Sequence, residues 1–123
     1  VMPVFHGVDY SGMVRAGTVT DRYGTAHDKR IVCPLCFYML SVWPNGDIYP
    51  CDALSDPSGL GNIMEVSLAD AWNGDKRKEF LRMQLRKERM SNSVCINCCA
   101  PDDVSRPEDE LDGHAEEILS RLT

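Results

Sequence analysis

The sequence lacks a long apolar stretch, an excess of positive charge and a secretion signal. No apolar run approaches the roughly 20 residues that a helix needs to cross a bilayer, so we expect no membrane span. The net charge of −6 argues against a nucleic-acid partner, because phosphate contacts require a basic surface. The first residues carry neither the charged segment nor the apolar core of a signal peptide. These absences predict a cytoplasmic protein, whose thiols stay reduced.

Six cysteines among 123 residues are the most distinctive feature of what is present. They fall into two groups, which consist of Cys33, Cys36 and Cys51 and of Cys95, Cys98 and Cys99. Both groups contain a Cys-x-x-Cys spacing, which is typical of metal sites. Apolar residues make up 43% of the chain and charged residues 26%, as expected of one globular domain with a modest core.

A β-hairpin is predicted between the second and third cysteines. Asn45-Gly46 separates two runs rich in β-branched and aromatic residues, which is the strongest short-range signal for a hairpin. The returning strand ends at Cys51 and should bring it back beside Cys33 or Cys36.

Four thiolates from these groups could hold a structural zinc ion or an iron–sulfur cluster. A plain zinc ribbon carries a Cys-x-x-Cys in both halves, whereas a lone Cys51 stands on the returning strand here. A thioredoxin-like motif should open a helix, but a predicted strand follows Cys33-Pro-Leu-Cys36. Disulfides are a further alternative, which the expected reducing compartment disfavours.

The N-terminal segment is predicted to be mainly loop, because glycines recur there between polar residues. One short extended piece is expected near residues 14–19. His6 and His27 lie at no ligand spacing from a cysteine, so we expect surface histidines rather than metal ligands.

Helices are predicted from Ser67 onward. Ser67 and Asp70 have the spacing of a capping box for a short helix over residues 68–72. Asn73-Gly74 should end this helix in a left-handed C-cap.

A second, basic helix is predicted over residues 76–90, with Asp75 as its cap. From Asp75 to Met90 there are seven Lys and Arg residues against three acids. We interpret the basic side chains as a solvated face, and a docking surface for an acidic partner is the alternative.

The last segment is acidic and should form a peripheral helix over residues 108–122, after a break at Arg106-Pro107. The apolar residues on one face of this helix are Leu111, Ala115, Ile118, Leu119 and Leu122.

The predicted fold class is α+β: a small β-hairpin followed by short helices, with a cysteine-ligated metal site joining the hairpin to the C-terminal turn. The expected organisation is a loop-rich segment 1–30, a metal-binding unit 31–100 and an acidic helical segment 101–123.

Several motifs follow one another in a fixed order. They are Cys33 followed by Gly46-x4-Cys51, then Leu60-Gly-Asn-Ile63, Ser67-Leu-Ala-Asp-Ala-Trp72, the basic helix and Cys95-x-x-Cys98. This order resembles the auxiliary-cluster region of radical S-adenosylmethionine (SAM) enzymes, called the SPASM domain or, in its shortened form, the twitch domain. Arg15-Ala-Gly17 is similar to a segment often found before the family's first cysteine. The resemblance covers about residues 12–100.

The resemblance implies one [4Fe–4S] cluster whose ligands are Cys33, Cys51, Cys95 and Cys98. Cys36 is an alternate for Cys33, because it also lies within the family's spacing from Gly46, and Cys99 is a spare. A full SPASM domain holds two clusters and has more cysteines at its end, so one cluster is the more economical expectation here. A zinc-binding protein-interaction module is the alternative.

The Cys-x3-Cys-x-x-Cys motif of the SAM-cleaving core is absent. The resemblance therefore implies that SAM is bound only by a catalytic barrel outside this sequence, and that this chain alone does not cleave SAM. Since the sequence also does not begin with Met, we expect a C-terminal domain excised from a longer oxidoreductase or maturase. Its expected partners are the barrel of the parent chain and a peptide or small-molecule substrate, and its expected role is electron transfer or substrate engagement.

Overall fold

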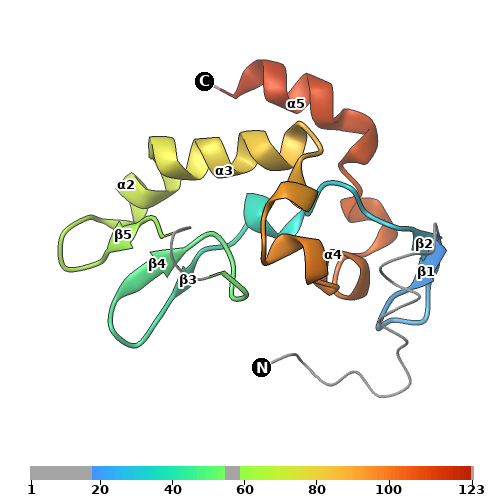
Figure 1. The fold of residues 1–123 in the computed structure, drawn as a ribbon, viewed down its shortest axis with the longest axis horizontal. Helices are drawn as coiled ribbons and strands as arrows, with labels where there is room; N and C mark the ends of the chain where they lie inside the picture. The colour runs from blue at the N-terminus through green and yellow to red at the C-terminus, as the bar shows by residue number, and fades with distance from the viewer. Residues whose placement is uncertain (1–17, 55–58, 123) are drawn as a thin grey trace.

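The computed structural model describes residues 18–54 and 59–122, which form two small antiparallel sheets and several short helices (Figure 1). The strands are β1 (Thr18–Thr20), β2 (Ala26–Asp28), β3 (Ser41–Val42), β4 (Asp47–Tyr49) and β5 (Gly61–Asn62). The α-helices are α2 (Leu68–Asn73), α3 (Asp75–Leu85), α4 (Ala100–Asp103) and α5 (Ala115–Arg121). Single 3-10 turns are η1 (Leu35–Phe37), η2 (Arg89–Ser91), η3 (Cys95–Asn97), η4 (Pro107–Asp109) and η5 (Asp112–His114). The predicted α+β class is confirmed.

The predicted hairpin is confirmed as β3 and β4. Gly46 adopts a φ of 91°, and its N–H donates to the carbonyl of Trp43 at 2.8 Å. A Cβ atom on Gly46 would lie 2.8 Å from Oδ1 of Asn62, so this turn needs glycine for its space as well as its conformation. β5 pairs with β4 as a third strand that the sequence did not predict, because two residues are too few to show a pattern.

The N-terminal hairpin was predicted only in part. β1 overlaps the extended piece expected near residues 14–19, of which 14–17 lie outside the described residues. β2 was not predicted; it returns after a turn in which Gly24 has a φ of 82°.

α2 begins as predicted, because the Ser67 hydroxyl accepts the N–H of Asp70 at 3.0 Å. The left-handed C-cap at Gly74 is wrong. Gly74 is extended, with φ −78° and ψ 162°, and serves at once as the C-cap of α2 and the N-cap of α3. A Cβ atom there would lie 2.9 Å from the carbonyl oxygen of Asp70, so glycine permits a close approach instead. Asp75 is the first residue of α3 rather than its cap.

α3 ends at Leu85, five residues before the predicted end at Met90. Lys87 has a φ of 62°, and its N–H donates to the carbonyl of Gln84 at 2.9 Å. The next N–H, from Glu88, reaches the carbonyl of Met83 at 3.0 Å. These two bonds make a Schellman motif with lysine where glycine is usual, which is why the sequence concealed it.

α5 lies along α3 and closes one apolar cluster (Figure 1). The cluster consists of Val32, Leu85 and Ala115 with Phe37, Leu111, Ile118, Leu119 and Leu122 against them. The predicted apolar stripe of the last segment is therefore confirmed. The predicted helix over 108–122 is wrong before Ala115, because carboxylates of Asp109 and Glu110 accept nearby backbone N–H groups and form short turns instead. None of the helices in the described ranges is both long and apolar enough to span a membrane.

Candidate metal centre

Five of the six cysteines approach one another where η1, the end of β4 and η3 meet. Burial is the largest cause that raises the pKa of Cys51, Cys95 and Cys98, and negative charge on Cys33 raises each of them further. The pKa of Cys36 is raised mainly by a hydrogen bond to Cys33 and by burial. Negative charge on Cys51 and on Cys95 raises it further. Such coupling weakens with distance, so these five thiols lie within electrostatic range of one another.

Cys33 and Cys36 interact directly through their side chains. The hydrogen bond between their side chains lowers the pKa of Cys33 and raises that of Cys36. The Cys36 thiol also lies 3.3 Å from the carbonyl oxygen of Cys33, to which it can donate. Cys36 is buried, whereas Cys33 is partly exposed. Cys33 is therefore the thiol of this pair that loses its proton more readily, and Cys36 is the donor beside it.

Cys51 and Cys95 are buried enough to stay protonated at neutral pH. Burial raises the pKa of Cys51 to about 12 and that of Cys95 to about 11, although Arg89 opposes the shift at Cys95. A thiol must lose its proton to bind a metal, so a cation bound here would displace protons.

No cysteine of the chain is disulfide-bonded in this structure. Cys99 is the N-cap residue of α4, and its carbonyl accepts the N–H groups of Asp102 and Asp103 at 3.0 and 2.9 Å. Across residues 18–54 and 59–122, no three His, Cys, Asp or Glu side chains lie close enough together to hold a single metal ion.

Gln84 joins the two halves of this site. Its side chain is fully buried on α3, and its Oε1 accepts the backbone N–H of Cys33 at 3.0 Å. Its Nε2 donates to Sγ of Cys95 at 3.7 Å. One amide thus spans the hairpin side and the C-terminal side of the cysteine group, and no pattern in the sequence indicates this contact.

Arg89 holds the second Cys-x-x-Cys turn. Its Nη2 donates to the carbonyl oxygens of Cys95 at 2.8 Å and Cys98 at 3.0 Å, and its Nη1 reaches that of Arg30 at 3.4 Å. Its guanidinium is 4% exposed and favours the ionised forms of Cys33, Cys95 and Cys98.

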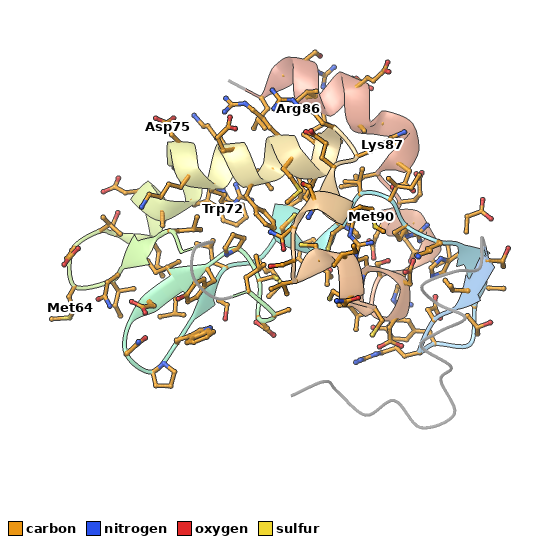
Figure 2. The ribbon with its side chains drawn as sticks, viewed as in Figure 1. Met64, Trp72, Asp75, Arg86, Lys87 and Met90 are labelled. Carbon is orange, nitrogen blue, oxygen red and sulfur yellow. The ribbon has the colours of Figure 1, made fainter. Side chains whose placement is uncertain are left out.

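Arg77 holds the first turn in a similar way. Its Nη2 donates to the carbonyl oxygen of Cys36 at 3.0 Å, and its guanidinium stacks 3.6 Å from the ring centroid of Trp72. We interpreted the basic residues from 76 to 90 as a solvated face. This is wrong for Arg77 and Arg89, which are both buried. Arg86 and Lys87 remain exposed as predicted (Figure 2).

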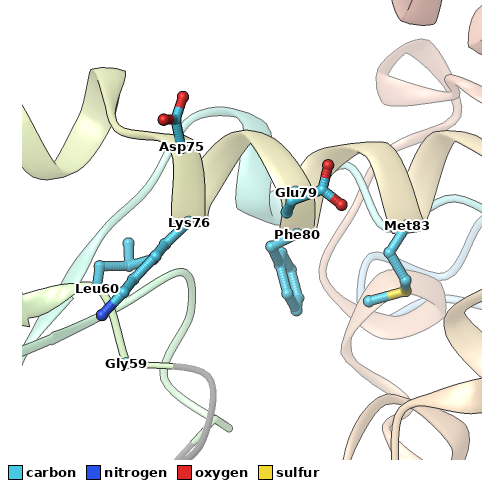
Figure 3. A pocket seen from close by; sticks show the side chains of 7 residues that line it. All are labelled: Gly59, Leu60, Asp75, Lys76, Glu79, Phe80 and Met83. Carbon is cyan, nitrogen blue, oxygen red and sulfur yellow. The ribbon is translucent and has the colours of Figure 1, made fainter.

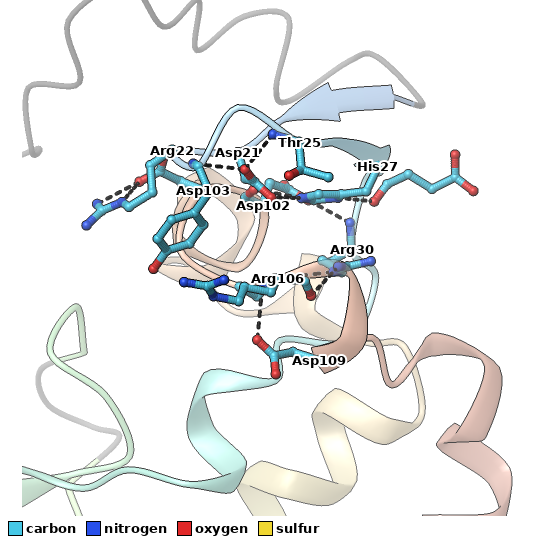
Figure 4. Close-up of polar contacts among 12 residues, drawn as sticks. Asp21, Arg22, Thr25, His27, Arg30, Asp102, Asp103, Arg106 and Asp109 are labelled. Carbon is cyan, nitrogen blue, oxygen red and sulfur yellow. Dashed lines mark hydrogen bonds and ion pairs between the residues drawn. The ribbon is translucent and has the colours of Figure 1, made fainter.

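His27 is not the surface histidine that we expected. Its side chain is buried, with Nδ1 2.8 Å from the carbonyl oxygen of Asp28 and Nε2 3.1 Å from that of Asp102 (Figure 4). The carboxylate of Asp21 lies 3.6 Å from Nε2. His27 is thus a structural histidine that links β2 to α4. His6 lies outside the described residues.

The same network holds α4 against the N-terminal hairpin (Figure 4). The backbone N–H of Arg30 donates to Oδ1 of Asp102 at 2.6 Å, and Arg22 pairs with Asp103 at 2.7 Å. Burial raises the pKa of the Asp102 carboxyl, and the N–H of Arg30 opposes that shift. These contacts anchor the segment after Cys98 to the N-terminal hairpin.

An open hollow of about 510 Å³ lies beside α3 (Figure 3). Its lining residues are Gly59, Leu60, Asp75, Lys76, Glu79, Phe80 and Met83. Phe80 also packs in the apolar cluster that contains Cys51 and Cys95, so the hollow borders the cysteine site.

Comparisons with known proteins agree with this arrangement. Residues 33–99, which contain all six cysteines, match the family model SPASM, described as an iron-sulfur cluster-binding domain. The chain is also 27% identical over 94 residues to the S-adenosyl-L-methionine-dependent 2-deoxy-scyllo-inosamine dehydrogenase of Niallia circulans. That alignment covers 74% of this chain and 38% of the relative, so the chain spans well under half of the relative's length. No solved structure matched the chain.

Proposed function

Because the chain belongs to the SPASM family of iron–sulfur cluster-binding domains, we propose that it is the auxiliary cluster domain of a radical SAM oxidoreductase. In this proposal one [4Fe–4S] cluster is bound by Cys33, Cys51, Cys95 and Cys98. The observation that carries the proposal is that these thiols come from three separate segments and lie within electrostatic range of one another. A set made only of thiolates fits such a cluster.

The residues around the thiols would bind and shield the cluster. Tyr49 and Leu54 are buried in one apolar cluster with Cys95, and Phe80 packs against it. An apolar shell of this kind limits access of water and so influences the redox potential of the group inside it. When bound, the cluster supplies a one-electron acceptor, which a two-electron oxidation needs if the first electron leaves with a hydrogen atom.

Cleavage of SAM and binding of the substrate are proposed for the catalytic barrel of the parent chain. The relative is named a dehydrogenase of 2-deoxy-scyllo-inosamine, a small molecule. This favours electron transfer during oxidation of a small polyhydroxylated substrate over a role in peptide maturation.

Anaerobic reconstitution of the full 123-residue chain with iron and sulfide tests the ligand set. We expect a brown protein with broad visible absorption and about four irons per chain. Cys51→Ala or Cys98→Ala should abolish the absorption, and Cys99→Ala, the matched control, should retain it. Cys33→Ala should also abolish it while Cys36→Ala does not.

Two results would reject parts of this proposal. A colourless protein that holds one zinc ion after purification and takes up no iron would favour the zinc module instead. Retention of the cluster in Cys33→Ala with its loss in Cys36→Ala would replace Cys33 by Cys36 as the first ligand.

A further inference from the structure

Two buried side chains outside the cysteines form hydrogen bonds to proposed ligands of the cluster. Both come from α3 and the turn after it, and both act on the backbone or sulfur of proposed ligands. Gln84 bonds the N–H of Cys33 and the sulfur of Cys95, while Arg89 bonds the carbonyl oxygens of Cys95 and Cys98.

Arg89 carries a charge that its surroundings do not balance directly. In the part of the chain that the structure describes, no carboxylate forms an ion pair with it, and its buried Nε has no hydrogen-bond partner. Buried charges are normally paired. The buried carboxylate of Asp102 lies within electrostatic range of Arg89 without forming an ion pair with it. Thiolates bound to a cluster would bring further negative charge to this guanidinium.

Gln84 has a complementary geometry. Its side chain is fully buried, so the amide is fixed by its two contacts and not by solvent. Its Nε2 donates toward Sγ of Cys95, and hydrogen bonds to ligand sulfur are among the factors that set the reduction potential of a cluster.

Reduction of a cluster adds one negative charge to it. A cation and an N–H donor held beside the ligands stabilise the reduced state more than the oxidised state. Their effect should be large because both groups are buried, where water screens charge poorly.

On the basis of the proposed function, we propose that Gln84 and Arg89 are positioning residues that hold the two halves of the ligand set together. The same two residues raise the reduction potential of the bound cluster. The hydrogen bonds fix the turn geometry, and the Arg89 charge with the Gln84 donor favours the reduced state.

The test is a redox titration of the reconstituted full chain and four variants, followed by visible absorption and electron paramagnetic resonance. Arg89→Gln removes the charge, Arg89→Lys keeps it, and Gln84→Met removes the amide at similar length. Arg82→Gln is the matched control. Arg82 lies on α3, as Gln84 does, but it pairs with Glu79 at the surface.

We expect Arg89→Gln to lower the ratio of reduced to oxidised cluster about tenfold at a fixed potential, which corresponds to ~59 mV for one electron. Gln84→Met should lower the potential in the same direction, while Arg89→Lys and Arg82→Gln stay near the parent value. If Arg89→Gln fails to hold iron, Arg89→Lys decides: recovery of the cluster at the parent potential supports the proposal, and no recovery overturns it.

Unchanged potentials in Arg89→Gln and Gln84→Met, with iron content intact, would overturn this inference and leave the proposed function standing. A shift in Arg82→Gln as large as that in Arg89→Gln would overturn it as well. Failure of the parent chain to bind iron would instead reject the proposed function.

Discussion

Lys87→Gly, at the end of α3, should give a more stable fold than Lys87→Ala. Lys87 occupies the left-handed position of the Schellman motif with a φ of 62°, and its side chain is exposed. This conformation costs a residue with a Cβ about 1–2 kcal/mol. Glycine avoids that cost but loses about 0.4–1 kcal/mol through its greater freedom in the unfolded chain. Relative to alanine at this position, the net effect on the free energy of unfolding is therefore a gain of about 1 kcal/mol.

The control is Lys87→Ala, which keeps the Cβ and removes the charge. A lysine near a helix C-terminus contributes about 0.3–1 kcal/mol through the helix dipole, and both variants lose this contribution equally. The difference between the two variants thus isolates the backbone conformation.

Urea unfolding of both variants at the same metal content measures the effect. For a small protein, 1 kcal/mol corresponds to a shift of about 0.5 M in the urea midpoint. Lys87→Gly should unfold at the higher midpoint, with an unchanged slope. If Lys87→Ala is equally or more stable, the left-handed conformation of residue 87 does not carry the cost that we assign to it.

Three further changes test other parts of the structure. Because burial raises the pKa of Cys51 to about 12 and of Cys95 to about 11, their protons must be displaced, and the affinity of the metal-free chain for Co²⁺ should rise from about pH 6 to about pH 9. Spectroscopic titration measures this affinity, and a constant value would contradict it. Gly46→Ala should lower the free energy of unfolding by about 1–3 kcal/mol, which is more than Gly24→Ala. Both glycines have a positive φ, but of the two only Gly46 lacks space for a Cβ. Equal urea midpoints for the two variants would show that Asn62 moves aside. Ser67→Ala should cost about 1 kcal/mol by thermal unfolding through loss of the α2 N-cap, whereas Ser67→Asp, which can still cap, should not.

The parts of the fold that depend on neighbouring residues were predictable. Asn45-Gly46 specified the hairpin, and Ser67 specified the start of α2, because each acts on its own backbone. The apolar stripe of the last segment identified the face that packs on α3 for the same reason. The resemblance to the SPASM domain indicated the four proposed ligands, whereas spacing alone left Cys33 and Cys36 as alternatives. Their ligation stays a prediction.

The parts that depend on distant partners were not predictable. β5 exists because it pairs with β4, and the buried position of His27 requires the carbonyl of Asp102, far along the chain. Arg89 looked like a solvated cation, because its partners are carbonyls of a turn whose position no local pattern reveals. Charged residues are usually exposed, so only the three-dimensional contacts could assign Arg89 to the interior.

The contacts of Arg77 and Arg89 also bear on how folding depends on the metal. Both donate to backbone carbonyls of the cysteine turns, at Cys36 and at Cys95 and Cys98, and these acceptors exist whether or not a cation is bound. The turns should therefore form in the metal-free chain, unlike zinc fingers, which unfold without their metal. The unpaired charge of Arg89 makes that state less stable until the thiolates form, so loading should raise the urea midpoint by linkage. Removal of the metal should lower the midpoint and leave a cooperative transition, and a chain that unfolds completely on chelation would show that the arginine contacts do not organise the turns.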